Sequence, residues 1–312
     1  ENRKRELPFR QLGRTLASLT RTGFYDEASL LDAVAEVTPT RFNAFVERVL
    51  DSALVRVYLF GNYDEAFAND LAKTLQSALP EERAGATEYA RERVYAPVPG
   101  QTLVKNRDLP VEDLGMMLLY AAPEATVANE AKGRVLARHL RNRAFDTLRT
   151  EEQLGYAAGG LTTTLQDHPM IGFYIQTPVK GPVAMLERFE AFAGEYALML
   201  DELTEEQFAN LKSGVLTQLT EPPTNLSDEA GPFIGDWDRE RYNFSSRSEM
   251  IAAVEAVSVE AIRDYYHATV LASEPSRILI QMRGERWQAE PFAVIEGATV
   301  IESVEAFHEQ MP

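Results

Sequence analysis

Hydrophobic positions near the start of the chain recur with the period of an amphipathic helix. Residues 8–20 place Phe9, Leu12, Leu16 and Leu19 three or four residues apart. This spacing puts all four side chains on one face of a helix, which predicts a helix with a single buried stripe.

Three more helices and one strand are predicted before residue 80. The helices are indicated over 27–35, after an N-cap at Thr38, and over 64–79. The β-branched and aromatic stretch LVRVYLFGN at 54–62 predicts a buried strand. This order of elements is typical of the back half of an α+β domain whose first strands are absent.

The chain after residue 100 has the pattern of a complete α+β domain. Hydrophobic runs predict strands at 114–121, 154–164, 171–177 and in RILIQM, 277–282. Longer amphipathic stretches predict helices at 128–147, 182–200, 204–219, from about 226, and at 258–267. Thr204 and Gln207 have the spacing of a capping box. The fold class predicted is α+β, with a mainly antiparallel sheet packed with helices.

A segment rich in charge, proline and glycine separates these two regions, at 80–100. We therefore predict one partial domain over 1–92 and one complete C-terminal domain over 93–312. The length of 312 residues fits this division. The first residue is not methionine and the first turns are already amphipathic, so we expect a piece of a longer polypeptide.

Charge and composition narrow the classes of partner. The net charge of −17 opposes general nucleic-acid binding, because phosphates would be repelled. The strongest basic stretch, within 1–21, has the spacing of a solvated helix face. No apolar run approaches the ~20 residues that a membrane span requires. We therefore expect neither nucleic acid nor membrane as a partner.

Familiar catalytic motifs are absent from the sequence. There is no cysteine, so disulfides, thiolate metal sites and cysteine nucleophiles are excluded. None of the four histidines lies in H-E-x-x-H or H-x-x-E-H, the two spacings that bring imidazoles and a carboxylate to one zinc ion. No G-x-S-x-G elbow and no glycine-rich phosphate loop occurs. The chain is predicted to have no metal ligands of its own.

One short segment combines residues that could bind a peptide, LRTEEQLGYAAGG at 148–160. The guanidinium of Arg149 can donate to carbonyl oxygens, and the phenol of Tyr156 can donate to a developing oxyanion. Glu151 and Glu152 would point about 100° apart on a helix, so we interpret them as capping or solvated residues. Periodicity by itself favours packing in a strand for Tyr156 and leaves a binding role as the alternative.

The same segment resembles R-[ST]-x-E-Q-L-G-Y in the C-terminal half of the pitrilysin and insulysin family of zinc metallopeptidases. Other segments are similar to that family in the same order, namely LFGNYDEAFANDLAKTL, FYIQT and RYNFSSRSEMIAAVEAVSVEAIRDYY. The resemblance extends from about residue 8 to about residue 283. It implies the latter part of the third domain and the fourth domain of such a peptidase.

The resemblance also implies a function. Such peptidases degrade peptides and small unfolded polypeptides inside a closed chamber, and their zinc ligands and general base belong to the N-terminal half, which this chain lacks. The chain alone is therefore expected to bind no zinc and to be inactive. Arg149 and Tyr156 are the implied substrate-binding residues, with Tyr156 also a candidate oxyanion stabiliser. The AAGGL that follows Tyr156 departs from the bulkier residues of many relatives, so the resemblance implies the role of the motif but not the family's substrate preference.

Two other functions stay open from the sequence. One is a non-catalytic partner or scaffold subunit of the same fold, which binds peptides or packs in a complex. The other is an unrelated binding domain. The family resemblance implies a periplasmic location, with the cytoplasm as the alternative.

Overall fold

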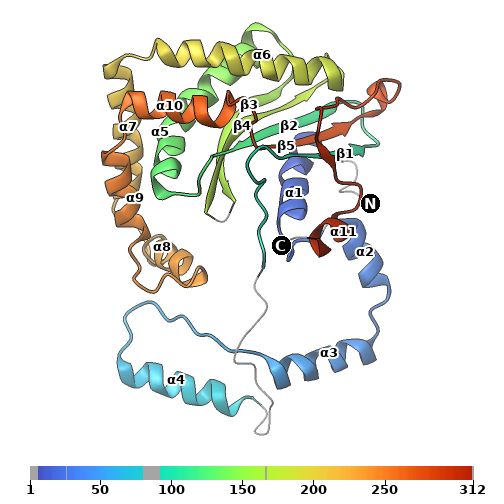
Figure 1. Ribbon diagram of the computed structural model, residues 1–312. Coiled ribbons are helices and arrows are strands. Elements are labelled where there is room, and N and C mark those ends of the chain that lie inside the picture. The colour runs from blue at the N-terminus through green and yellow to red at the C-terminus, as the bar shows by residue number, and fades with distance from the viewer. Residues whose placement is uncertain (1–5, 26, 80–91, 166, 311–312) are drawn as a thin grey trace. The chain divides into compact units, whose positions relative to one another are not determined.

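The computed structural model describes residues 6–25, 27–79, 92–165 and 167–310 (Figure 1). The chain divides into two compact units. The larger comprises residues 1–26, 93–220 and 248–312, and the smaller comprises 27–92 and 221–247. The chain passes from one unit to the other at residue 92, where the sequence predicts a domain boundary. The larger unit also includes the first helix, however, and the smaller one includes a later segment, so the assignment of 1–92 and 93–312 as domains stays a prediction.

A six-stranded sheet forms the centre of the larger unit, in the order β3-β4-β2-β5-β1-β6. Its strands are β1 (Thr102–Asp108), β2 (Leu114–Ala121), β3 (Ala157–Leu165), β4 (His168–Thr177), β5 (Arg277–Arg283) and β6 (Thr299–Val300). The pairs β3–β4, β4–β2 and β2–β5 are antiparallel, whereas β1 runs parallel to both β5 and β6. The prediction of an α+β fold with a mainly antiparallel sheet is therefore confirmed.

Both faces of this sheet are covered by helices (Figure 1). Along β2, Met116 and Leu118 pack toward α5 (Val127–Phe145), α6 (Pro182–Asp201) and α10 (Val259–Val270). Met117 and Leu119 pack toward α1 (Pro8–Thr20) on the opposite face. This alternation follows from the two-residue period of a strand. It explains why all eight residues of β2 are buried.

The remaining helices of the chain agree with the hydrophobic periodicity in most cases. They are α2 (Glu27–Ala35), α3 (Pro39–Ser52), α4 (Glu65–Ser77), α7 (Glu205–Thr220), α8 (Leu226–Asp238), α9 (Ser246–Glu255) and α11 (Val304–Glu309). The predicted capping box is present, because Gln207 donates its backbone N–H to Thr204 Oγ1 at 3.2 Å and its side chain accepts from the Thr204 N–H at 3.0 Å. No helix in the described part of the chain has the length and apolarity needed to cross a membrane.

The predicted strand at 54–62 is wrong. Residues 53–60 have no regular secondary structure and belong to no sheet, since no strand of the described residues pairs with them. Their aromatic rings instead contact α8 within the smaller unit. The ring centres of Tyr58 and Trp237 are 5.8 Å apart, and those of Phe60 and Phe233 are 5.6 Å apart. The hydrophobic and β-branched residues of this segment therefore serve to pack aromatic rings against a helix, and they do not form a strand.

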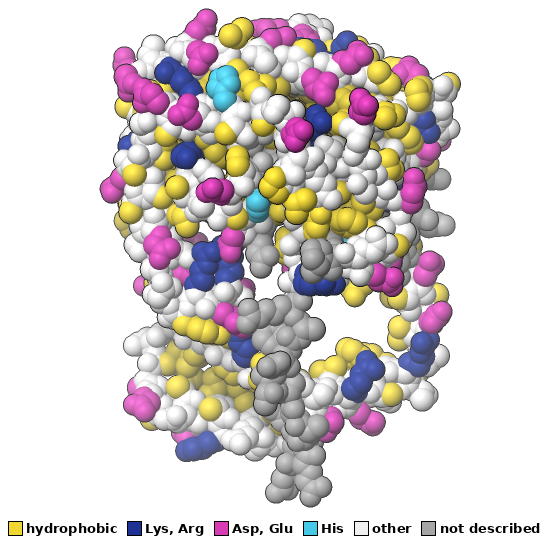
Figure 2. All heavy atoms as spheres, viewed as in Figure 1, with side chains coloured by type: hydrophobic (Ala, Val, Ile, Leu, Met, Phe, Trp, Pro, Cys, Tyr) yellow, Lys and Arg dark blue, Asp and Glu magenta, His cyan; other side chains and the backbone are white. Residues whose placement is uncertain are grey.

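Hydrophobic side chains of the smaller unit are widely exposed. No residue of α3 or α4 is buried. On α3, Phe42 is 56% and Phe45 51% exposed, although the sequence places them on one apolar face. Hydrophobic side chains are visible on the surface over both helices in Figure 2. These helices thus have an apolar face that the described residues do not cover.

A half-buried histidine joins two helices of the larger unit. His139 Nδ1 on α5 lies 2.8 Å from the hydroxyl of Tyr196 on α6, and Arg143 Nε donates to the other ring nitrogen at 3.4 Å. Burial, followed by the nearby positive charge of Arg143, lowers the pKa of His139 to about 4. An unfolded histidine takes up its proton at a pKa of about 6.5. Between these values the unfolded state binds the additional proton, so the free energy of unfolding falls as the pH falls.

We therefore expect a loss of stability on acidification that depends on His139. In urea denaturation between about pH 7 and pH 4.5, His139→Gln should reduce the fall in the unfolding free energy, because this side chain cannot be protonated. The carboxylates titrate in both proteins, so the difference between the pH dependences of their unfolding free energies is due to His139. Identical pH slopes for the two proteins would contradict the assignment.

Candidate functional site

The segment LRTEEQLGY forms a turn between α5 and β3. The helix α5 continues directly into a π-helical turn, Asp146–Glu151. The N–H of Glu152 donates to Thr147 O and that of Leu154 to Leu148 O, both at 3.0 Å. The side chains of Leu148 and Leu154 are buried in the main core. The two leucines therefore fix the inner side of the turn, and wide helical turns of this kind recur at functional sites.

Close backbone packing fixes the end of the turn against β4. Gln153 has a left-handed conformation with φ of 54°. A Cβ atom on Gly155 would lie 1.9 Å from Gln176 O, so only glycine permits this approach. The hydroxyl of Thr177 donates to Leu154 O. The L-G-Y part of the motif thus has a steric reason for its glycine.

Arg149 lies on the outer side of the turn. Its side chain is exposed, and its guanidinium carbon lies 4.6 Å from the centre of the Phe145 ring. In the part of the chain that the structure describes, the guanidinium has no ion pair or hydrogen bond. Stacking on Phe145 orients the group while its N–H donors stay open to a ligand.

Tyr156 follows the turn and directly precedes β3. It is 48% exposed, and no described residue forms a hydrogen bond with its hydroxyl. Partial burial, and then the negative charge of Asp113, raise the pKa of Tyr156 above its ordinary value. The phenol therefore keeps its proton at neutral pH and is available as a donor. Tyr156 and Arg149, which lies at the other end of the same turn, share no hydrogen bond or cation–π contact.

Asp113 and Gln176 also belong to this site and were not predicted from the sequence. Gln176 Nε2 donates to Asp113 Oδ2 at 2.7 Å, and Gln176 Oε1 accepts the backbone N–H of Phe9 at 3.4 Å. The chain positions of Asp113 and Gln176 are 63 residues apart. Gln176 belongs to the family-like segment FYIQT, but no pattern in the sequence marks either residue as part of the site. Their contact depends on the pairing of β2 with β4, which the sequence pattern does not specify.

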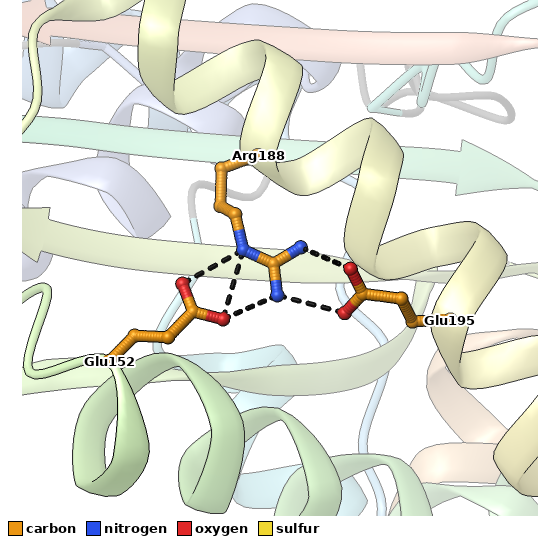
Figure 3. Close-up of polar contacts among 3 residues, drawn as sticks. All are labelled: Glu152, Arg188 and Glu195. Atoms are coloured by element: carbon orange, nitrogen blue, oxygen red, sulfur yellow. Dashed lines mark hydrogen bonds and ion pairs between the residues drawn. The ribbon is translucent and has the colours of Figure 1, made fainter.

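The interpretation of Glu152 as a capping or solvated residue is wrong. Its carboxylate accepts hydrogen bonds from Arg188 on α6, with Nε at 3.0 and 2.8 Å from its two oxygens (Figure 3). The same guanidinium donates to Glu195 at 3.1 and 2.8 Å. The side chain of Arg188 is only 14% exposed. A half-buried arginine thus ties the turn to α6.

The described residues supply no metal centre. Among residues 6–25, 27–79, 92–165 and 167–310, no three histidine, aspartate or glutamate side chains are grouped so that they could hold a metal ion. The donors in these described ranges therefore do not form the set of three protein ligands that a catalytic zinc ion needs.

Metal analysis can test this expectation. After washing with a weak chelator, the isolated chain should contain far less than one zinc ion per molecule. It should also leave a fluorogenic peptide intact, because no three ligands for a catalytic metal are grouped among the residues that the structure describes. Stoichiometric zinc, or cleavage that a strong chelator abolishes, would contradict the expectation.

Comparisons of sequence relate the chain to known peptidases. Residues 135–234 match the family model described as PQQ synthase PqqF-like, C-terminal lobe domain 4. Protease 3 of Escherichia coli K12 is 24% identical over 295 residues, which are 94% of this chain and 30% of that protein. The insulin-degrading enzyme of Drosophila melanogaster is 22% identical over 96% of this chain and 31% of its own length. The chain thus spans about 30% of the length of these curated relatives.

Solved structures share the fold. The crystal structure of pitrilysin matches 95% of this chain and 32% of its own, with a TM-score of 0.85 at 23% identity. The peptidase M16 inactive domain from Pseudomonas fluorescens matches 93% of this chain and 68% of its own, with a TM-score of 0.62 at 14% identity. The elements that position Arg149 and Tyr156 therefore lie in a fold that M16 peptidases share.

Proposed function

Because the chain is homologous to the C-terminal region of the pitrilysin (insulinase) family of peptidases, we propose that it is the substrate-binding half of a zinc-dependent endopeptidase. Its parent would degrade peptides and small unfolded polypeptides inside a chamber that this half forms with an N-terminal half. The zinc ion, its ligands and the general base would belong to that N-terminal half. A periplasmic location is part of the proposal and follows from the family resemblance.

The observation that carries the proposal is the pair of open donors on one fixed turn. Arg149 presents a guanidinium and Tyr156 a protonated phenol, and neither donor is used by a described residue. In this proposal Arg149 donates to a carbonyl oxygen of the peptide backbone, and Tyr156 donates to the oxyanion that develops at the scissile carbonyl. Both groups recognise backbone atoms, which suits a peptidase that accepts varied sequences.

Substitution of Arg149 tests the binding part of the proposal. In a polypeptide that carries both halves, Arg149→Ala should raise KM and lower kcat/KM, since a guanidinium on a substrate carbonyl acts in the bound ground state as well as in the transition state. A charged hydrogen bond of about 1.5–3 kcal/mol corresponds to a loss of roughly 10- to 150-fold in kcat/KM. Arg149→Lys should restore only part, because lysine lacks the planar fork.

The matched control is Arg141→Ala, which removes an exposed arginine of α5, eight residues before Arg149. Steady-state kinetics of the three variants on one fluorogenic peptide should separate the two positions. Equal kinetics for Arg149→Ala and Arg141→Ala would refute a substrate contact by Arg149.

A second candidate function is a non-catalytic partner subunit of the same fold. The structural match to an M16 domain described as inactive favours it, because that domain has this fold without activity. The two candidates differ in the N-terminal half of the parent. An H-x-x-E-H motif there supports the peptidase, and its absence supports the partner subunit.

A further inference from the structure

We propose that Arg188 is a positioning residue whose guanidinium, held between Glu152 and Glu195, fixes the turn that carries Arg149 and Tyr156. The proposal rests on the proposed function, since it concerns how these two side chains are presented to a peptide. It assigns no contact between Arg188 and substrate.

The Arg188 guanidinium donates hydrogen bonds to carboxylates on two sides, those of Glu152 and Glu195 (Figure 3). Toward the turn, Nε donates to both oxygens of Glu152, and Nη2 donates to one of them as well. Toward its own helix, Nη1 and Nη2 donate to the two oxygens of Glu195. A planar fork held on two sides has little rotational freedom. Glu195 thus orients Arg188, and Arg188 in turn holds Glu152.

The helix α6 is a rigid base for this contact. The side chains of Met185, Phe189 and Phe192 on α6 are fully buried in the main core. The Arg188 guanidinium also lies 5.8 Å from the centre of the Phe192 ring. A displacement of Arg188 would therefore require movement of a packed helix or a change of side-chain rotamer.

The turn requires such a restraint on its outer side. Glu152 directly precedes Gln153, whose left-handed backbone with φ of 54° is uncommon for a residue other than glycine. Strained residues of this kind persist where the surrounding contacts hold them. Glu152 lies three residues after Arg149 and four before Tyr156. A rotation of the backbone here would redirect both side chains.

Removal of Arg188 should loosen the turn without unfolding the protein. Leu148 and Leu154 anchor the inner side in the core, and Thr177 holds Leu154 O independently. The ion-pair cluster lies at the surface of this packing, since Glu152 and Glu195 remain 29% and 46% exposed. The expected effect is therefore local mobility and not a core defect.

Amide hydrogen exchange on the 312-residue chain tests the local effect without any activity. In Arg188→Gln, the amides of Glu152 and Leu154 should exchange roughly tenfold faster or more, while amides of β2 and β4 keep their rates. The matched control is Arg134→Gln, which removes an arginine paired with Glu130 at 2.8 Å elsewhere on the larger unit. Unchanged exchange in the turn would overturn the proposal.

Kinetics of the complete peptidase test the positioning role. A misplacement of about 1 Å can reduce turnover about 100-fold, so Arg188→Gln should lower kcat/KM by roughly 10- to 100-fold, and Arg188→Lys should recover part of it. In a background with both Arg149→Ala and Tyr156→Phe the loss should be much smaller, because both positioned groups are already absent. Equal losses in both backgrounds would mean a purely structural role and would overturn the proposal.

The outcomes separate this inference from the proposed function. If Arg149→Ala and Tyr156→Phe reduce activity but Arg188→Gln does not, only the positioning role fails. If the first two substitutions leave activity unchanged, the proposed function itself fails. In that second case the exchange experiment still reports whether Arg188 restrains the turn.

Discussion

Tyr156→Phe in the complete peptidase should lower kcat by roughly 100- to 1,000-fold, with a much smaller change in KM. The removed hydroxyl is a donor to the developing oxyanion, so its contribution appears mainly in the transition state. Loss of one such donor typically costs about 2.7–4 kcal/mol. The phenol is suited to this role because its raised pKa keeps it protonated and because no described residue competes for its hydrogen bond.

Steady-state kinetics and melting temperatures on the same purified proteins provide the measurement. Tyr25→Phe is the matched control, since Tyr25 is a similarly exposed tyrosine of the larger unit, at 61%. Its kcat should equal that of the unmodified enzyme. A Tyr156→Phe enzyme that keeps its kcat, or that loses activity only in proportion to its stability, would identify Tyr156 as a packing residue.

Hydrogen exchange on the isolated chain should show a large difference between the two units. Amides of α3 and α4 should be protected far less than those of β2 and β4, by on the order of 1,000-fold or more. No residue of α3 or α4 is buried, so opening these helices exposes little additional apolar surface, whereas opening β2 disrupts the core.

The prediction distinguishes a helix stabilised by its own hydrogen bonds from one stabilised by packing. Short helices are marginal in water without a packed apolar face. The two helices of the smaller unit can be compared with α1, which also lies before residue 92 but has Leu12 and Leu19 fully buried. Equal protection of α1, α3 and α4 would contradict the prediction.

Most elements of the larger unit were predictable because local and tertiary signals agree there. The run LGMMLLYA predicts β2 with its observed bounds, since a central strand covered on both faces is hydrophobic at every position. Cap residues mark helix starts equally well, as the Ser258 hydroxyl does by accepting the Ala261 N–H at 3.2 Å.

Other elements depend on partners that sequence spacing does not reveal. The strand β1, TLVKNRD, has a polar second half and lacks a clear period, yet it pairs over its full length with β5. The opposite holds at 54–62, where the composition is typical of a strand but the described residues contain no strand that pairs with it. Both cases reflect tertiary context that overrides local propensity.

The candidate site was predictable only as far as its motif extends. Arg149 and Tyr156 lie within nine residues of recognisable sequence, and the glycine between them has a steric reason in the structure. Arg188 lies 36 residues from Glu152 in the sequence. The hydrophobic periodicity of α6 predicts which of its residues are buried, but not which residue the Arg188 side chain contacts. The contacts that hold the motif in place, such as that of Arg188 with Glu152, could therefore be identified only from the three-dimensional structure.

The position of β1 in the sheet has a consequence for synthesis of the chain on the ribosome. Both neighbours of β1 lie near the other end of the chain, and its pairing with β5 joins residues 175 positions apart, such as Asp108 and Arg283. At ~5–20 residues per second, β1 emerges roughly 10–35 s before β5 is available. During this interval its backbone donors and acceptors are without their native partners. A nascent chain that pauses in the helices between them would expose an edge that other nascent chains could join.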